Sequence, residues 1–282
     1  MVTKEQCDYL LPRAFNAALR AGAAILDVYD KGRDYEITIK EDLTPLTEAD
    51  SRSHNIIKNY LGRTRVPILS EEGRAMLFQE RMGWDLFWMV DPLDGTKEFI
   101  KGNGEFTVNI ALMADNQPVL GIVYVPYIGR MYFADSERGS FLRENTYPEE
   151  DAEYSLEEMM AEARQLPLTT AANNPVRVAV SRSHNTEDTY ALLDKLREKF
   201  PDMEVIEQGS SYKFCMLAEG TVDYYVRTTP TMEWDTAAGQ VILETTGGTV
   251  RTIPNGTPIK YNDETLINPG FACRSRFMPE EA

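Results

Sequence analysis

Two aspartates, Asp91 and Asp94, lie three residues apart directly after the apolar run 87–90. We expect that run to be a buried strand, which the proline after Asp91 ends because it has no backbone N–H, while Gly95 permits a tight turn. The two carboxylates and the Leu93 carbonyl can then point at one spot. Asp-Gly is also common in ordinary turns, but two carboxylates held together repel each other unless a cation lies between them. The segment therefore predicts a cation site.

Three further acidic elements could complete that site: Asp50, the pair Glu71 and Glu72, and Asp235. Asp235 is expected in the first turn of a helix, and Asp50 could be either a helix N-cap or a site residue. Oxygen ligands of this kind suit Mg²⁺, which takes one or two carboxylates per ion together with water and phosphate oxygens.

The cysteines and histidines favour no other metal. Cys7, Cys215 and Cys273 are widely spaced, which supports neither a disulfide framework nor a zinc site. His54 and His184 are too few and too far apart for a histidine-rich centre. Any bound metal is therefore expected to have carboxylate ligands.

The net charge also limits the partners. The 282 residues carry 45 Asp and Glu against 29 Lys and Arg, a formal charge of −16. Binding to a nucleic-acid polymer depends on cations placed against phosphates, so we exclude that class of partner. No apolar run approaches the ~20 residues that span a bilayer, and the N-terminus does not resemble a secretory signal. We expect a cytoplasmic protein without a transmembrane segment, and peripheral association with the inner membrane stays open.

The first half of the chain is expected to combine helices with an antiparallel sheet. Apolar residues recur with a helical period up to Gly32, and Pro12 is expected in the first turn of that helix or at its start. A second helix is expected over 50–62. The strands of the sheet are expected at 87–90, 106–112, 119–125 and 130–134.

The second half alternates strands with helices. Residues 144–175 change to acidic, alanine-rich and proline-containing sequence, so we divide the chain into a metal-binding domain (1–150), a connecting segment (151–174) and a substrate-binding domain (175–282). Alternation of strand and helix is typical of α/β structure. The helices are expected at 156–163, 186–200, 211–218 and 234–245, and the strands at 177–180, 204–207, 223–227 and 249–251.

Three motifs together resemble the inositol monophosphatase superfamily, a family of lithium-sensitive, magnesium-dependent phosphatases. They are Glu71-Glu72, the segment Asp91 to Thr96, and the segment Trp234 to Gly239. Their order and spacing match, and the resemblance spans nearly the whole chain. It implies a layered αβαβα sandwich, with an antiparallel N-terminal sheet domain and an α/β C-terminal domain, and an active site between them.

Further segments resemble the CysQ branch of this superfamily, whose members are 3'(2'),5'-bisphosphate nucleotidases. They are residues 91–100, 103–109, 180–184 and 209–215. The resemblance implies hydrolysis of the 3'-phosphate of adenosine 3',5'-bisphosphate to AMP, which clears a by-product of sulfate assimilation. The alternatives are an inositol or sugar phosphate phosphatase of the same superfamily, or a catalytically silent nucleotide- or metal-binding regulator.

The resemblance also assigns the metal ligands. Glu71, Asp91 and the Leu93 carbonyl are expected to hold one Mg²⁺, and Asp91, Asp94 and Asp235 a second. Of the two neighbouring glutamates, the family pattern favours Glu71 over Glu72 as the ligand. Lithium inhibition is expected from the family as well.

The catalytic and substrate residues follow in the same way. Thr96 and Glu71 are expected to orient the attacking water, and Asp50 lies near a weaker third metal position. Ser210 and Lys213, at a helix start, can meet a phosphate. Arg227 resembles an arginine that contacts the second phosphate, although this chain reads Tyr-Val-Arg where many relatives read Tyr-Pro-Arg. The residues expected at the substrate are Glu71, Leu93, Asp94, Gly95, Thr96, Ser210, Lys213, Arg227 and Asp235. We expect a monomer or a homodimer.

Overall fold

The structure is a computed structural model that describes residues 2–32, 37–39, 45–148 and 153–278. The helices of these parts are α1 (Lys4–Tyr29), α2 (Glu48–Gly62), α3 (Phe78–Arg81), α4 (Thr96–Lys101), α5 (Leu156–Ala161), α6 (Glu187–Lys199), α7 (Tyr212–Glu219) and α8 (Ala237–Glu244), with short 3₁₀ turns η1 (Pro126–Ile128) and η2 (Glu233–Asp235). The strands are β1 (Ile37–Ile39), β2 (Pro45–Thr47), β3 (Ile68–Ser70), β4 (Leu86–Asp94), β5 (Thr107–Ala114), β6 (Gln117–Val125), β7 (Arg130–Asp135), β8 (Gly139–Arg143), β9 (Arg164–Gln165), β10 (Arg177–Ser181), β11 (Glu204–Gln208), β12 (Tyr224–Arg227), β13 (Thr231–Met232), β14 (Thr249–Thr252), β15 (Ile267–Asn268) and β16 (Phe271–Arg274).

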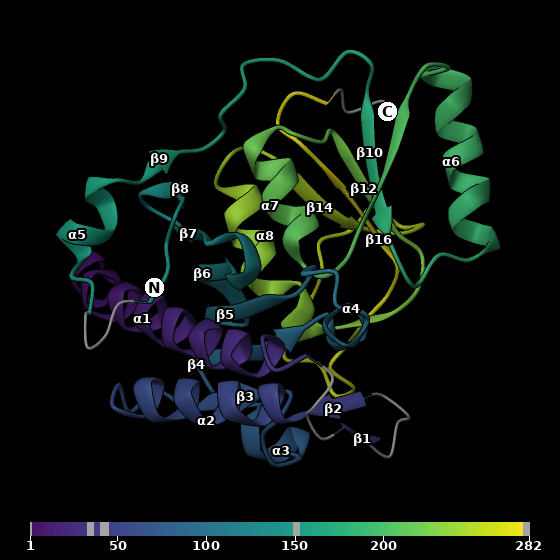
Figure 1. Cartoon of the computed structure of the whole chain (residues 1–282). Coiled ribbons are helices and arrows are strands. Elements are labelled where there is room, and N and C mark those ends of the chain that lie inside the picture. The colour runs from purple at the N-terminus through teal and green to yellow at the C-terminus, as the bar shows by residue number, and fades with distance from the viewer. Residues whose placement is uncertain (1, 33–36, 40–44, 149–152, 279–282) are drawn as a thin grey trace.

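The main elements form five layers, in the order helices, sheet, helices, sheet, helix (Figure 1). Helices α1 and α2 lie side by side and cover one face of a seven-stranded sheet, where their apolar residues share a core with the sheet. Helices α7 and α8 pack between that sheet and a five-stranded sheet. Helix α6 covers the outer face of the second sheet. The predicted αβαβα sandwich is confirmed.

The seven-stranded sheet has the order β3-β4-β5-β6-β7-β8-β9. Its strands from β4 to β9 are antiparallel, as predicted for β4 to β7, but β3 runs parallel to β4. No strand was predicted at β8 or β9, or at β3. Its three residues are too short to show an alternating pattern, and a parallel neighbour is joined through a longer connection rather than a tight hairpin.

The five-stranded sheet has the order β11-β10-β12-β16-β14. Strands β10, β11 and β12 are parallel to one another, as the α/β prediction requires. Strand β16 lies antiparallel between β12 and β14 and was not predicted. The parallel strands place the ends of β10 and β12 at the same edge of the sheet, and residues of that edge line the cavity described below.

The two halves of the chain share one hydrophobic core. Residues of the first sheet and of α7 and α8 belong to the same buried cluster. Helix α8 approaches β6 so closely that a Cβ added at Gly121 would lie 2.5 Å from the Ala238 carbonyl oxygen. Likewise, a Cβ at Gly239 would lie 2.6 Å from the Phe214 ring. The predicted division into two domains stays a prediction, and its boundary at residues 150 and 151 lies outside the described residues.

Helix α1 begins earlier than its apolar period indicated. Thr3 is its N-cap, and the Thr3 and Gln6 side chains bond reciprocally to each other's backbone N–H in a capping box. Pro12 therefore lies inside the helix, and the prediction that it marks the start or first turn was wrong. The Pro12 carbonyl accepts a hydrogen bond of 2.8 Å from the Asn16 side-chain amide.

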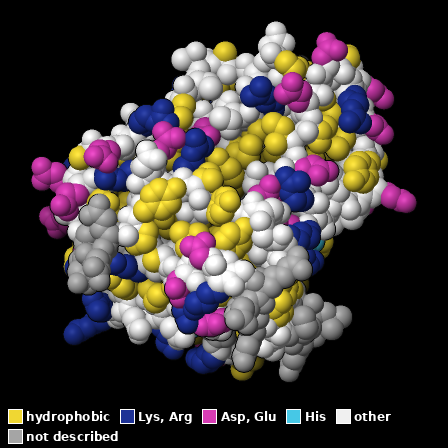
Figure 2. Space-filling model, in the orientation of Figure 1, with side chains coloured by type: hydrophobic (Ala, Val, Ile, Leu, Met, Phe, Trp, Pro, Cys, Tyr) yellow, Lys and Arg dark blue, Asp and Glu magenta, His cyan; other side chains and the backbone are white. Residues whose placement is uncertain are grey.

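Charged side chains of both signs are mixed on the surface shown in Figure 2, and the cysteines are buried. On the face of the molecule in Figure 2, acidic side chains are interspersed with basic ones and do not form one patch. None of the helices in the described parts combines the length and apolar composition that crossing a bilayer requires. Cys7, Cys215 and Cys273 are free and buried.

Candidate active site

A cavity of about 540 Å³ lies where the ends of β4 and β12 meet the segments before α7 and α8. Residues of both halves of the chain line it. The lining includes all the residues predicted as metal ligands or substrate contacts: Glu71, Asp91, Leu93, Asp94, Gly95, Thr96, Ser210, Lys213, Arg227 and Asp235. The structure thus brings together side chains that are up to 164 positions apart in the sequence, from Glu71 to Asp235.

The end of β4 carries the two aspartates. The register of β4 against β5 shifts between Asp91 and Asp94, so the strand bulges there and both carboxyl groups reach the cavity. The Leu93 backbone N–H donates to Asp91 Oδ1 at 3.0 Å. Gly95 follows with a φ of +94°, and a Cβ there would lie 2.8 Å from the Glu105 carbonyl oxygen. This turn requires glycine on both grounds.

Glu71 and Asp235 reach the same cavity from other elements. Glu71 follows β3, and its backbone N–H donates to the Val90 carbonyl at 3.1 Å, which places it beside the end of β4. Glu72 is not among the residues that line the cavity. Asp235 was predicted in the first turn of a helix, but it ends the 3₁₀ turn η2 before α8, where it accepts the Met232 backbone N–H at 2.9 Å.

We call Glu71, Asp91, Asp94 and Asp235 the acidic wall. Burial raises the pKa of Asp91 well above its ordinary value, and the charges of Glu71, Asp94 and Asp235 raise it further. Burial likewise raises the pKa of Asp235 well above its ordinary value, again with help from its carboxylate neighbours. Burial raises the pKa of Asp94 to about 6, although Lys213 and a backbone N–H oppose the shift. Carboxylates crowded in this way are stable as anions only beside a cation.

The chemistry of the acidic wall fits Mg²⁺. Its donors are all oxygens, and Leu93, whose carbonyl accepts from the Thr96 hydroxyl at 3.4 Å, also lines the cavity. Among the described residues, no three His, Cys, Asp or Glu side chains are already gathered in a ligand arrangement.

Asp50 was predicted as a possible N-cap of the second helix, but it is the capping-box partner of that cap. Thr47 is the N-cap of α2, so the N-cap interpretation of Asp50 was wrong. Asp50 is the third residue of the helix, and its carboxylate accepts the Thr47 backbone N–H at 2.8 Å in a capping box. The Thr96 hydroxyl also donates to Asp50, at 3.2 Å. Asp50 therefore stands behind Thr96 and is not a cavity-lining residue itself.

We call Lys97, His184, Lys213 and Arg227 the basic wall of the cavity. Lys213 is 2% exposed, and its ammonium donates to the carbonyls of Gln208, at 2.9 Å, and Ser210. Burial lowers the pKa of Lys213 to about 8, although the charge of Asp94 opposes the shift. Lys213 was predicted to bind phosphate, but its ammonium already holds the backbone before α7.

The rest of the basic wall is less buried. Arg227 ends β12, as predicted, and its Nε donates to the Thr229 carbonyl at 3.3 Å. Lys97 Nζ lies 3.1 Å from His184 Nε2. Burial lowers the pKa of His184 to about 4, with further contributions from Arg227 and Lys97. Neither His184 nor Lys97 was predicted at the site, because they meet only where the segment after β10 contacts α4.

Comparisons with known proteins agree with this arrangement. The model of the "Inositol monophosphatase family" matches residues 7–278. The 3'(2'),5'-bisphosphate nucleotidase CysQ of Salmonella typhimurium is 38% identical over 264 residues, which cover 93% of this chain and 98% of the relative. The protein of the same name from Escherichia coli strain K12 is 38% identical over 265 residues, with the same coverage.

Solved structures give the same family. The crystal structure of CysQ from Bacteroides thetaiotaomicron, described as a bacterial member of the inositol monophosphatase family, superposes with a TM-score of 0.85 at 42% identity, covering 94% of this chain and 96% of that one. The Thermotoga maritima IMPase, at 19% identity and a TM-score of 0.68 over 93% of this chain and 90% of that one, supports the fold. The chain belongs to the inositol monophosphatase family.

Proposed function

We propose that this protein is a 3'(2'),5'-bisphosphate nucleotidase that hydrolyses the 3'-phosphate of adenosine 3',5'-bisphosphate to AMP and phosphate. The observation that carries the proposal is the pairing of the acidic wall with the basic wall in one cavity. A cation site can act on one phosphate while the basic wall accepts another. The nucleotidase names of relatives at 38% identity over nearly the whole chain support the same substrate.

We infer that Mg²⁺ is the metal and that two ions bind. Glu71, Asp91 and the Leu93 carbonyl would hold one, and Asp91, Asp94 and Asp235 the other, with a weaker third position near Asp50. The chemistry that Mg²⁺ supplies when bound is neutralisation of the phosphoryl and leaving oxygens and a lower pKa for the attacking water. The carboxylates of the acidic wall support this assignment, because burial and their mutual repulsion raise the pKa values of Asp91 and Asp235, and a bound cation would offset both effects.

Thr96 can orient the attacking water through a hydrogen-bond relay. Its hydroxyl has one hydrogen and two acceptors within reach, Asp50 at 3.2 Å and the Leu93 carbonyl at 3.4 Å. The oxygen lone pairs of Thr96 are then available to accept a hydrogen bond from water in the cavity. Asp50 is held in turn by the Thr47 backbone N–H and hydroxyl. Glu71 lines the same cavity. We assign it as the carboxylate that accepts the proton of that water which is not hydrogen-bonded to Thr96.

The second phosphate is assigned to the basic wall. Arg227 is half-buried at the end of β12 and can offer a planar, charged donor set to a phosphate. Lys213 supports this end of the cavity indirectly, because its ammonium holds the Ser210 carbonyl and so fixes the residue whose side chain lines the cavity. Ser210 has a φ of +53°, which presents it at the turn before α7.

The experiment that tests the proposal compares substrates. Phosphate release is measured with adenosine 3',5'-bisphosphate and with inositol 1-phosphate, each with and without Mg²⁺. We expect a higher kcat/KM for the nucleotide and no turnover after chelation. A preference for inositol 1-phosphate would reject the substrate assignment in favour of an inositol or sugar phosphate phosphatase, and absence of turnover on both would favour a silent regulator.

We also propose a division into a metal-binding domain (1–150) and a substrate-binding domain (175–282), a cytoplasmic location, lithium sensitivity, and a monomeric or homodimeric state. Because the two halves share a buried cluster, we expect the two proposed domains to depend on each other for stability, although they contribute different chemistry to the cavity.

A further inference from the structure

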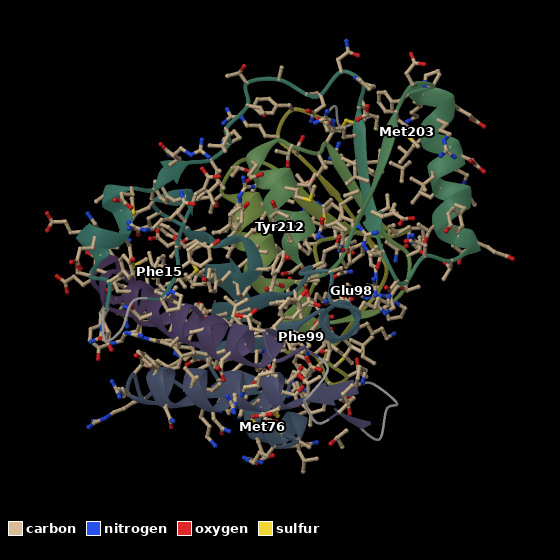
Figure 3. The ribbon with its side chains drawn as sticks, viewed as in Figure 1. Phe15, Met76, Glu98, Phe99, Met203 and Tyr212 are labelled. Carbon is tan, nitrogen blue, oxygen red and sulfur yellow. The ribbon has the colours of Figure 1, made fainter. Side chains whose placement is uncertain are left out.

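Three sequence motifs meet beside Asp94. They are residues 103–109, which lead into β5, residues 180–184 at the end of β10, and residues 209–215, which lead into α7. Figure 3 shows α4, which follows Asp94 and carries Glu98, close to the strands of the second sheet. Among the residues of the three motifs, Ser211 contacts both Asp94 and the segment 103–109.

Ser211 joins the two halves of the chain through its backbone and its side chain. Its backbone N–H donates to Asp94 Oδ2. Its hydroxyl donates to Asn109 Oδ1 at 2.6 Å and lies 2.8 Å from the Thr107 hydroxyl. Since the Ser211 hydroxyl has one hydrogen and directs it to Asn109, the Thr107 hydroxyl must be the donor in the second contact. Ser211 is 3% exposed, so water does not compete for these bonds.

The turn before Ser211 is held from its other side by Glu105. The Gly209 backbone N–H donates to Glu105 Oε2 at 2.7 Å. Arg182 donates two hydrogen bonds to the same carboxylate, at 2.6 and 2.7 Å, and a third to the Glu207 carbonyl. A Cβ at Gly209 would lie 2.8 Å from Glu98 Cγ. The turn therefore fits closely against the first half and has little room to shift.

We propose that Ser211 is a positioning residue of the hydrolytic site. Its hydroxyl, fixed by Thr107 and Asn109, holds the Ser211 N–H on one oxygen of Asp94, which leaves the other oxygen oriented toward the cavity for a cation. The inference rests on the proposed metal-dependent function. In the β4–β5 register Asn109 is the partner of Asp91 and Thr107 is the partner of Asp94, so the two residues that fix the Ser211 hydroxyl lie opposite the two aspartates of β4. Groups that orient metal ligands in this way typically change metal affinity when they are removed.

Metal binding without turnover tests this role directly. The purified protein is stripped with a chelator and titrated with Mn²⁺, and the free Mn²⁺ is measured by electron paramagnetic resonance. We expect Ser211→Ala to raise the Mn²⁺ dissociation constant by about tenfold or more, the size typical of residues that support metal ligands. Thr107→Val, which removes only the hydroxyl, should raise it less, and Thr107→Ser should retain the wild-type value.

Ser140→Ala is the matched control. Ser140 is 1% exposed, and its hydroxyl also bridges the two halves, by donating to the Ile242 carbonyl at 2.6 Å, but it lies outside the cavity lining. It should lose stability without changing the Mn²⁺ dissociation constant. A folded Ser211→Ala protein with wild-type Mn²⁺ affinity overturns the inference, as does an equal loss in Ser140→Ala. If Ser211→Ala does not fold, the difference between Thr107→Val and Thr107→Ser decides.

The outcomes also separate this inference from the proposed function. A wild-type protein that binds Mn²⁺ but does not hydrolyse the bisphosphate nucleotide rejects the nucleotidase assignment, and the Ser211 comparison still decides the positioning role. A wild-type protein that binds no Mn²⁺ rejects both.

Discussion

The two walls of the cavity differ in how their charges are satisfied within the chain. In the acidic wall, Asp91 and Asp235 are pressed against other carboxylates, and burial together with like charge raises their pKa values. In the basic wall, the cations already have acceptors: Lys213 holds two carbonyls and Arg227 holds one. The acidic wall is therefore electrostatically incomplete without an added cation, whereas the basic wall is oriented before any ligand arrives.

This difference indicates a division of labour. A site that needs a cation to relieve repulsion couples metal binding to the ordering of its own carboxylates. A wall of cations held by backbone carbonyls has less side-chain entropy to lose when an anion binds. We therefore expect changes in the acidic wall to alter metal dependence and catalytic rate, and changes in the basic wall to alter the choice of substrate.

The largest effect is expected from Asp94→Asn in the acidic wall. Asparagine keeps an oxygen that can accept the Ser211 N–H but removes the charge that faces the cation. Losing several kcal/mol of metal-assisted stabilisation lowers kcat/KM by about 1,000-fold or more. The measurement is phosphate release at saturating Mg²⁺, with circular dichroism to confirm that the variant is folded. Undiminished turnover would remove Asp94 from the metal site.

A smaller and more selective effect is expected from Arg227→Gln in the basic wall. Loss of a charge-assisted hydrogen bond costs ~1.5–3 kcal/mol, which raises the KM for adenosine 3',5'-bisphosphate roughly 10- to 100-fold. Adenosine 3'-monophosphate lacks the second phosphate and serves as the matched substrate. Its kcat/KM should be nearly unchanged in the variant, and an equal loss on both substrates would mean that Arg227 does not contact the second phosphate.

The acidic wall could be predicted from the sequence because its chemistry is local. Asp91, Asp94 and Gly95 lie within five residues, and the strand, bulge and turn that orient them are encoded by the same segment. Asp235 was also predicted at the site, but it lies in a 3₁₀ turn before α8 and not in the first turn of that helix. A turn of three residues has no periodicity by which it could be distinguished from a helix start.

The basic wall could be predicted only in part because it depends on long-range packing. His184 and Lys97 are 87 positions apart, and nothing in either segment alone indicates that they touch. Lys213 has the residue type and the place expected of a phosphate ligand, yet its burial turns the ammonium toward two backbone carbonyls. The N-cap prediction for Asp50 was wrong for a different reason: the Thr-x-x-Asp spacing makes Thr47 the cap and Asp50 its capping-box partner, and both residue types favour helix starts.

Thr47→Ala tests the contribution to stability of the hydrogen bonds that hold Asp50 behind Thr96. The substitution removes the N-cap of α2 and one of the hydrogen bonds that hold Asp50 behind Thr96. Loss of such a cap costs about 1 kcal/mol, which lowers the melting temperature by about 2–4 °C in a chain of this size. Thermal denaturation measures the loss, and Thr47→Ser, which keeps a capping hydroxyl, should recover most of it. If the melting temperature of Thr47→Ser is as low as that of Thr47→Ala, the capping role is contradicted.

The smallest effect concerns the protonation of His184 in the basic wall. Burial beside Arg227 and Lys97 lowers the pKa of His184 from its ordinary 6.5 to about 4. As the pH falls from 6.5 toward 4, the unfolded chain binds a proton at this residue that the folded chain does not, so His184 costs the folded protein stability in that window. His184→Gln removes the cost, and its free energy of unfolding should exceed that of the wild type by about 0.2–1 kcal/mol more at pH 5 than at pH 7, after allowance for solvent screening.

His54→Gln is the matched control for that measurement. His54 is also half-buried, and burial and Lys58 lower its pKa, but it lies against Ser70 and not in the cavity. Denaturant unfolding of both variants at the two pH values should give the larger change for His184→Gln. Equal changes would mean that Arg227 and Lys97 add no more at His184 than Lys58 adds at His54. A larger change at His184 would mean that Arg227 and Lys97 add to the effect of burial, and that they are the charges of this end of the basic wall while the imidazole stays neutral through the physiological range.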